Sequence, residues 1–104
     1  MEESKPVVIR WNSVTIPDEQ LLRELMVKDG LQPYRWSNYP GDIYLPHTHP
    51  YFKVLYVVKG SIIFELANGE TLELKAGDRL NLPTGIEHAA RVGGKGVVCL
   101  EAIL

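Results

Sequence analysis

Short runs of alternating apolar and polar residues occupy most of the chain after Gly30, and turn-forming residues separate them. In residues 61–66, for example, Ile62, Phe64 and Leu66 occupy every second position. This period of two is typical of a strand with one buried face and one mostly wet face. The pattern predicts seven or eight short strands, near residues 33–37, 43–47, 51–58, 61–66, 71–75, 79–82, 88–92 and 96–103.

The segment before Gly30 has a different periodicity. Residues 7–16 are rich in β-branched side chains and predict one strand or two short ones. Between residues 17 and 28 the apolar positions recur with helical spacing, and Thr15 with Asp18 resembles a capping box at the start of this helix. Gly30 suits its C-terminal end. The apolar stripe is interpreted as core packing, and it consists of Leu21, Leu22, Leu25 and Met26.

Glycine-containing dipeptides support the β assignment. Asn68-Gly69 lies between two alternating runs and is a strong hairpin signal. Lys59-Gly60 and Gly93-Gly94 predict two further turns. Short strands at this spacing are typical of a sandwich or a barrel. We therefore expect an all-β fold with one short helix near the N-terminus, built as a single domain from 104 residues.

The composition limits the classes of protein to which the chain can belong. Hydrophobic residues make up 45% and charged residues 23%, as in an ordinary globular domain. The net charge is −2 and no basic run occurs, which argues against binding to nucleic acid or to an anionic membrane surface. No apolar run approaches the ~20 residues that span a bilayer, and the polar residues 1–8 do not resemble a secretory signal. The single cysteine, Cys99, fits a reducing interior, so we expect a cytoplasmic protein.

The three histidines of the chain are the candidate metal ligands. His47 and His49 stand two positions apart, so in an extended strand both side chains point to the same face, with Cα atoms ~7 Å apart. His88 follows a Pro-Thr-Gly turn and opens another apolar run, so it can come to lie beside them. Three imidazoles suit Zn, Fe, Ni, Cu or Mn about equally well. The alternative is a polar strand end whose histidines have only a structural role.

Two motifs extend these observations to a known family. Residues 41–60 have the pattern G-x5-HTH-x3-K-x6-G, and they resemble the first motif of the cupin superfamily. Residues 77–88 have the pattern G-x5-P-x-G-x2-H and resemble the second cupin motif. The chain departs from the family at two positions: Lys53 stands where the first motif has glutamate, and Val92 stands where the second motif ends in asparagine.

The resemblance implies a double-stranded β-helix, or jelly-roll cupin barrel, with a divalent transition metal held inside one end. The ligands that it implies are His47, His49 and His88. It also implies a single cupin domain over residues 1–104, with an N-terminal strand and helix in 1–32 and the barrel in 33–104. Cupins include dioxygenases, isomerases, decarboxylases and non-catalytic sensors, so the fold does not select a chemistry.

Lys53 is the departure with the greatest chemical consequence. A charged lysine donates hydrogen bonds but cannot ligate a cation, and its charge repels a nearby divalent ion. Three states stay open: a neutral lysine, a charged lysine paired with an anion bound at the metal, and a lysine turned out to solvent. Our hypothesis is the second, in which Lys53 anchors a small anionic molecule beside the metal.

Neighbouring residues extend the candidate pocket. Tyr51 stands two positions before Lys53, so in an extended strand both side chains point to the same face. Both are candidate catalytic residues, unless the proline before Tyr51 disturbs the register. Ile43 and Leu45 share parity with His47, so we expect them to supply an apolar lining. Other residues receive structural interpretations: core or interface for Tyr34 and Trp36, surface for Glu87, turn organisation for Asp78, and core packing for Cys99.

Two functions stay open. The first is a small metal-dependent enzyme, namely an oxygenase, isomerase or lyase that acts on an anionic metabolite. The second is a non-catalytic cupin that binds or senses a small molecule, and a metal-free structural barrel is a third alternative. We expect a homodimer, because cupins often dimerise and apolar residues near the N-terminus can cover an open sheet edge of the same or a partner subunit, namely Val7, Val8, Ile9 and Trp11.

Overall fold

The computed structural model describes residues 5–104, so the first four residues of the segment considered above for a secretory signal lie outside it. No helix within the described residues has the length and apolarity needed to cross a membrane. In chain order the elements are β1 (Val7–Ile9), α1 (Glu19–Lys28), β2 (Tyr34–Asn38), β3 (Ile43–His47), β4 (Lys53–Leu66), β5 (Thr71–Lys75), β6 (Arg79–Leu82) and β7 (His88–Ile103).

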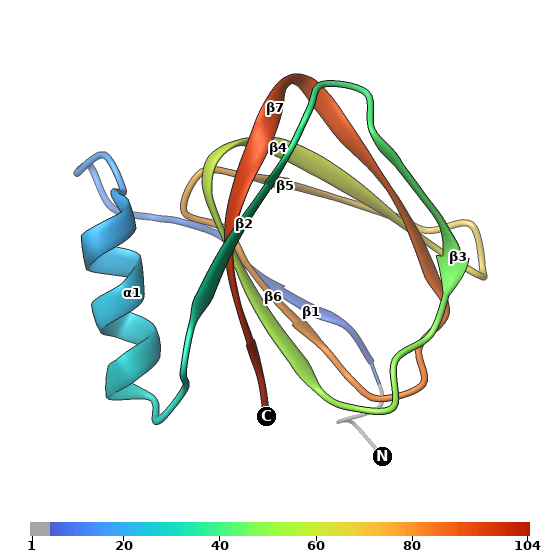
Figure 1. Cartoon of the computed structure of the whole chain (residues 1–104), viewed down its shortest axis with the longest axis horizontal. Helices are drawn as coiled ribbons and strands as arrows, with labels where there is room; N and C mark the ends of the chain where they lie inside the picture. Colours follow the sequence, from blue (N-terminus) through green and yellow to red (C-terminus); the bar gives the residue numbers. More distant parts are fainter. Residues whose placement is uncertain (1–4) are drawn as a thin grey trace.

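The antiparallel ladder between β4 and β7 is the central element of the barrel. The first half of β4 pairs with β6 and its second half pairs with β5. In the same way, the first half of β7 pairs with β3 and its second half pairs with β2. These antiparallel pairings roll the chain into a jelly-roll barrel with α1 outside it (Figure 1). The predicted all-β class with one short helix is therefore confirmed.

β4 and β7 are each one long strand, whereas the sequence pattern predicted two strands in each region. Lys59-Gly60 and Gly93-Gly94 were predicted to be turns, but neither reverses the chain. Both strands instead bend at glycines with positive φ, which is 80° at Gly60 and 78° at Gly96. A β-carbon on Gly60 would lie only 2.0 Å from the carbonyl oxygen of Gly96. The bend therefore requires a residue without a side chain.

The shorter sequence signals were partly correct. Asn68-Gly69 forms the turn between β4 and β5, as predicted. The helix begins at Glu19, and its N-cap is Asp18, whose carboxylate accepts a hydrogen bond from the Leu21 N–H at 2.8 Å. The predicted capping box with Thr15 was wrong, because the carboxylate of Asp18 already satisfies the first turn of the helix.

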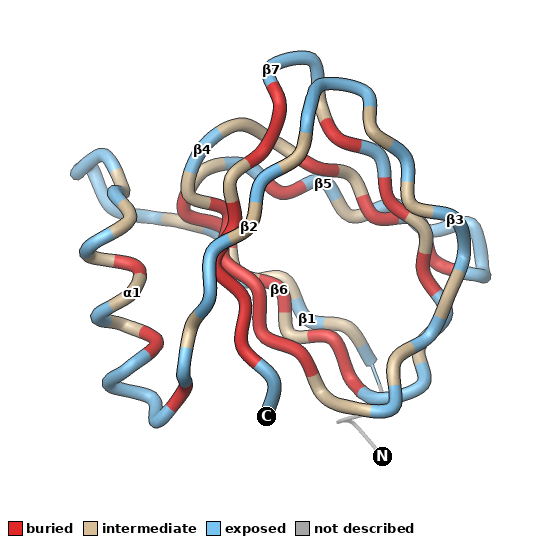
Figure 2. The backbone as a smooth tube through the Cα atoms, in the orientation of Figure 1, coloured by how far each residue is buried: buried red, intermediate tan, exposed pale blue. Residues whose placement is uncertain are grey.

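Two apolar clusters pack on opposite faces of the central ladder. The first fills the barrel interior and includes Leu55 and Cys99, both fully buried. The second lies on the outer face, where Leu22 and Met26 of α1 pack together with Val54 of β4. Figure 2 shows buried residues on the side of α1 that faces the barrel and along the ladder itself. Cys99 and three residues of the helical stripe, Leu22, Leu25 and Met26, thus belong to the core as predicted, whereas Leu21 is in neither cluster.

Asp78 ties the N-terminal strand to the turn between β5 and β6. Its carboxylate accepts hydrogen bonds from the N–H groups of Lys75 at 2.9 Å and Trp11 at 3.0 Å, and from the guanidinium of Arg10 at 2.9 Å. Burial by itself would raise the pKa of Asp78, but these donors together lower it. The predicted turn-organising role is confirmed. β1 also pairs with β6 of its own chain, and the homodimer stays a prediction.

The replacement Gly60→Ala is expected to destabilise the fold by roughly 3 kcal/mol or more, because a positive φ costs about 1–2 kcal/mol and the contact with Gly96 adds strain. Gly69→Ala is the matched control, since Gly69 has φ 88° but its β-carbon would meet nothing within 4 Å. Its expected cost is only about 1 kcal/mol. Urea denaturation of both variants measures the difference, and equal losses would contradict the assigned role of the close contact.

Candidate metal centre

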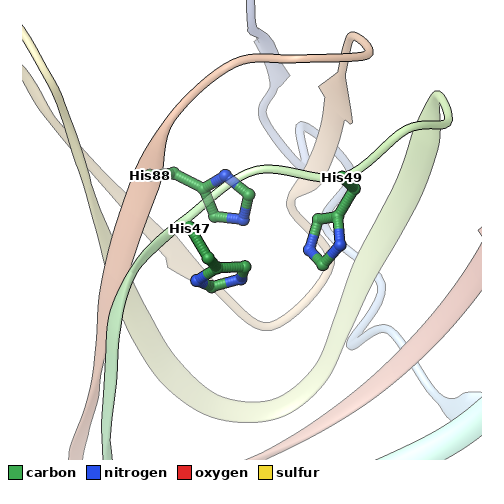
Figure 3. A group of neighbouring side chains, drawn as sticks. All are labelled: His47, His49 and His88. Carbon is green, nitrogen blue, oxygen red and sulfur yellow. The ribbon is translucent and has the colours of Figure 1, made fainter.

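The three histidines come from two segments that are far apart in the sequence. His47 is the last residue of β3, His49 lies in the loop that follows, and His88 is the first residue of β7. The pairing of β3 with β7 places His47 directly opposite His88. All three rings turn toward one common space (Figure 3). The fold therefore brings together the three residues that the motifs singled out.

The spacing of the rings suits a single ion. One nitrogen of each ring lies within 4.8 Å of the corresponding nitrogens of the other two. The ring centroids are 4.8 Å apart for His47 and His49, 4.4 Å for His47 and His88, and 5.2 Å for His49 and His88. Zinc–nitrogen bonds of about 2.0–2.1 Å would need nitrogens about 3.3 Å apart in a tetrahedral site. Small side-chain movements that bring the three nitrogens closer together are sufficient to reach that separation.

Backbone carbonyls determine which nitrogen of two rings faces the common space. The Nδ1–H of His47 donates to the carbonyl of Leu45 at 2.6 Å, and the Nδ1–H of His88 donates to the carbonyl of Ile86 at 2.9 Å. Because a carbonyl oxygen only accepts, Nε2 of each neutral ring keeps its lone pair. Metal-bound histidines in proteins are usually oriented by this kind of hydrogen bond.

The third ring is oriented by Tyr51. Nδ1 of His49 shares a hydrogen bond with the Tyr51 hydroxyl at 3.1 Å, and the two rings stack with centroids 5.0 Å apart. Among the described residues, Nε2 of His49 and Nε2 of His88 are buried without any hydrogen-bond partner. Buried polar atoms in folded proteins nearly always have one. Two such unpartnered nitrogens beside one space fit a bound cation.

The surroundings favour the neutral form of the rings, which is the form that binds a metal. Burial lowers the pKa of His88 to about 4, and the positive charge of Lys53 lowers it as well. The hydrogen bond to the Ile86 carbonyl acts in the opposite direction and raises the pKa. Burial also lowers the pKa of His49, where the charge of Lys53 again lowers it and that of Glu101 raises it. Both rings are therefore neutral at pH 7.

Lys53 pairs with a carboxylate that the sequence analysis missed. Its Nζ lies 3.6 Å from Oε1 of Glu101, and only 9% and 7% of the two side chains are exposed. Glu101 also accepts hydrogen bonds from the Tyr34 hydroxyl at 2.6 Å and from Trp36 Nε1 at 3.0 Å. A signal existed, because Glu101 is the one charged residue in the apolar run 97–104, and such a residue usually has a buried partner. Lys53 is not turned out to solvent.

A cavity of about 300 Å³ connects the histidines with this ion pair. The volume lies at the lower end of the range for small-molecule sites. Besides the histidines, Lys53 and Glu101, the wall is mainly aromatic and apolar, and it consists of Tyr34, Trp36, Tyr44, Ile62, Phe64 and Ala90. The arrangement can hold a small molecule with an apolar body and at least one polar group.

The predicted apolar lining by Ile43 and Leu45 was wrong, because these side chains are 67% and 76% exposed. Tyr44 lines the cavity in their place. The register between β3 and β7 shifts between Tyr44 and His47, so two residues three positions apart both face inward. The expectation for Ile43 and Leu45 failed because it assumed that side chains alternate without interruption as far as His47.

The aromatic residues upstream of the first motif have a larger role than predicted. Trp36 packs against the interior cluster, as expected of a core residue. Both Tyr34 and Trp36 also line the cavity and hold Glu101 in place. Tyr51 contacts His49 and is not part of the cavity wall. Glu87 is exposed, as predicted.

Comparison with known families gives one match. The family model described as "Cupin domain" matches residues 35–103, a range that includes the three histidines, Lys53 and Glu101. None of the curated proteins matches the chain by sequence.

Several solved structures resemble the fold. An uncharacterized conserved protein with a double-stranded β-helix domain from Klebsiella pneumoniae is 26% identical, with a TM-score of 0.59 over 68% of this chain and 64% of its own. The DMSP lyase DddQ from Ruegeria pomeroyi is 25% identical, with a TM-score of 0.63 over 70% of this chain and 37% of its own. This chain thus spans less than two thirds of either. A DUF861 family protein from Thermotoga maritima, 14% identical, shows the fold alone, with a TM-score of 0.64 over 96% of this chain and 100% of its own.

Metal-free protein is expected to lose stability as the pH falls from about 6.5 toward about 4. In the unfolded chain His88 takes up a proton near its ordinary pKa of 6.5, whereas in the folded protein it stays neutral down to about 4. The unfolded state therefore binds more protons in this interval, and His88 contributes a loss of stability of roughly 3 kcal/mol as the pH falls.

Urea denaturation across this pH interval, in the presence of a chelator, measures the loss. His88→Gln removes the titrating ring, so its stability should depend less on pH over the same interval. Superimposable pH profiles for the two proteins would contradict the assignment of the effect to His88.

Proposed function

This chain belongs to the cupin domain family, and from that membership we propose that it is a small metal-binding cupin. His47, His49 and His88 hold a divalent transition metal, and the adjoining cavity binds a small anionic metabolite. The metal is zinc, iron, nickel, manganese or copper, because three imidazole nitrogens accept each of these ions.

The observation that carries the proposal is the pair of buried, unpartnered Nε2 atoms of His49 and His88 beside His47. Among the described residues no Asp, Glu or Cys joins this cluster. A site with three protein ligands leaves coordination positions for a ligand, as catalytic metal sites do. When bound, the ion would supply a Lewis acid that polarises an oxygen of the ligand.

The residues around the histidines have separable roles in this proposal. Tyr51 orients the ring of His49. Tyr44 and Phe64 form apolar wall and exclude water from the bound molecule. The Nζ of Lys53 approaches Glu101 only to 3.6 Å, beyond the usual hydrogen-bond length, so its N–H groups are available to a carboxylate or another acceptor on the ligand.

Two kinds of activity fit this site. Similarity to a protein described as a DMSP lyase favours lyase chemistry over oxygenase or isomerase chemistry. Non-catalytic binding or sensing is the second candidate, and the engagement of Glu101 favours it. Its carboxylate accepts hydrogen bonds from Tyr34 and Trp36 and is paired with Lys53, so both of its oxygens are already engaged within the protein.

Protein purified without a metal-affinity tag is expected to retain a transition metal, which elemental analysis measures. His88→Gln removes a buried ligand and should lower the affinity for added Zn²⁺ by roughly tenfold or more. Glu87→Gln is the control, because Glu87 adjoins His88 in sequence but is exposed. A wild-type protein that neither contains a metal nor is stabilised by any of the five ions would overturn the proposal.

A thermal-shift screen of small carboxylic acids on the metal-loaded protein is expected to find ligands that raise the unfolding temperature. Lys53→Met should remove most of this shift, because the ammonium that binds the anionic group is lost. Lys59→Met alters an exposed lysine of the same strand and should leave the shift unchanged. Equal shifts in all three proteins would exclude Lys53 as the anchor.

A further inference from the structure

The carboxylate that is missing at position 53 is present in the same cavity on a different strand. The ladder between β4 and β7 pairs Leu55 with Glu101, so Glu101 is a diagonal neighbour of Lys53 on the interior face. We propose that Glu101 is a positioning residue that compensates the charge of Lys53 and thereby allows a cation to bind between the three histidines. This inference rests on the proposed metal site.

The position of Glu101 is set by two aromatic residues on the adjacent strand. β2 pairs with β7 so that Tyr34 lies directly opposite Glu101. The Tyr34 hydroxyl donates to Oε2 and Trp36 Nε1 donates to Oε1. Since each oxygen has its own donor, the carboxylate is held in one orientation and carries its negative charge. Its place in the cavity does not depend on Lys53.

Glu101 is not itself a member of the histidine cluster. Among residues 5–104, only the ligand atoms of His47, His49 and His88 lie close enough together to hold one ion. Both oxygens of Glu101 are already engaged by Tyr34 and Trp36. The carboxylate therefore acts on a bound ion through space and through Lys53, not as a ligand.

The need for compensation follows from the location of Lys53. This buried ammonium lines the cavity that the histidines line. An uncompensated positive charge there would oppose a divalent ion, because the cavity wall is mostly apolar and screens charge poorly. With Glu101 3.6 Å away, the two side chains together have no net charge. The pair replaces a glutamate ligand by a neutral unit whose N–H groups can still meet a ligand molecule.

The test is a set of Zn²⁺ affinities measured on the full chain by competition with a chromogenic chelator. The variants are Glu101→Gln, Lys53→Met and the double variant Lys53→Met/Glu101→Gln. Glu65→Gln is the matched control, because it removes one negative charge from an exposed position on β4. Circular dichroism establishes that each variant is folded before its affinity is compared.

Glu101→Gln is expected to weaken Zn²⁺ binding roughly tenfold to a hundredfold, and Lys53→Met to tighten it by a similar factor. The double variant should bind close to the wild-type affinity, and Glu65→Gln should not differ from it. A residue that only stabilised the fold would not produce this order, since both single changes break the same ion pair.

Glu101→Gln leaves a buried ammonium unpaired, so this variant can fail to fold. In that case the test is the comparison of Lys53→Met with the double variant. The inference requires the double variant to bind Zn²⁺ more weakly than Lys53→Met does. Wild-type affinity in Glu101→Gln, or no tightening in Lys53→Met, overturns the inference while the metal site stands. A wild-type protein that does not bind Zn²⁺ or the other candidate ions overturns the inference together with the proposed function.

Discussion

The bent ladder between β4 and β7 is the constraint on which the rest of the structure depends. It pairs Lys53 with Ile103 at one end and Leu66 with His88 at the other. A flat strand of 14 residues would be ~45 Å long, which exceeds the longest dimension of the molecule, 34 Å. Because the ladder bends at its glycines, Lys53 and His88 line one cavity instead of lying at opposite ends of a sheet. The bend thus brings the polar side chains of the site together.

The alternation of apolar residues was sufficient to predict the class of the fold and the positions of most strands. It failed at Gly60 and at Gly93-Gly94, because a glycine gives the same local signal in a hairpin turn and in a sharply bent strand. What distinguishes the two is the partner strand, since Gly60 has the carbonyl of Gly96 against it. That contact joins residues far apart in the chain, and no local pattern contains it.

In the site, too, local sequence patterns identified some residues, whereas the role of others depends on contacts between distant parts of the chain. The histidines could be found because the motifs place histidines at fixed spacings, whereas Tyr44 could not, because a register shift reverses the parity of β3. Glu101 was missed for a related reason. Its relation to Lys53 is a diagonal contact across two strands, and it becomes visible only when the pairing register is known. An isolated charge in an apolar run was the sole hint in the sequence.

The first half of β4 is buried on both faces, by the barrel interior on one side and by α1 on the other. Residues 54–58, Val-Leu-Tyr-Val-Val, form a short β-prone apolar segment of the kind that drives aggregation when it is exposed before the chain has folded. Lys53 and Lys59 flank this segment with like charges, which disfavour stacking between chains. Lys53, which lines the cavity in the folded protein, is thus also one of the two charges that flank this segment before folding.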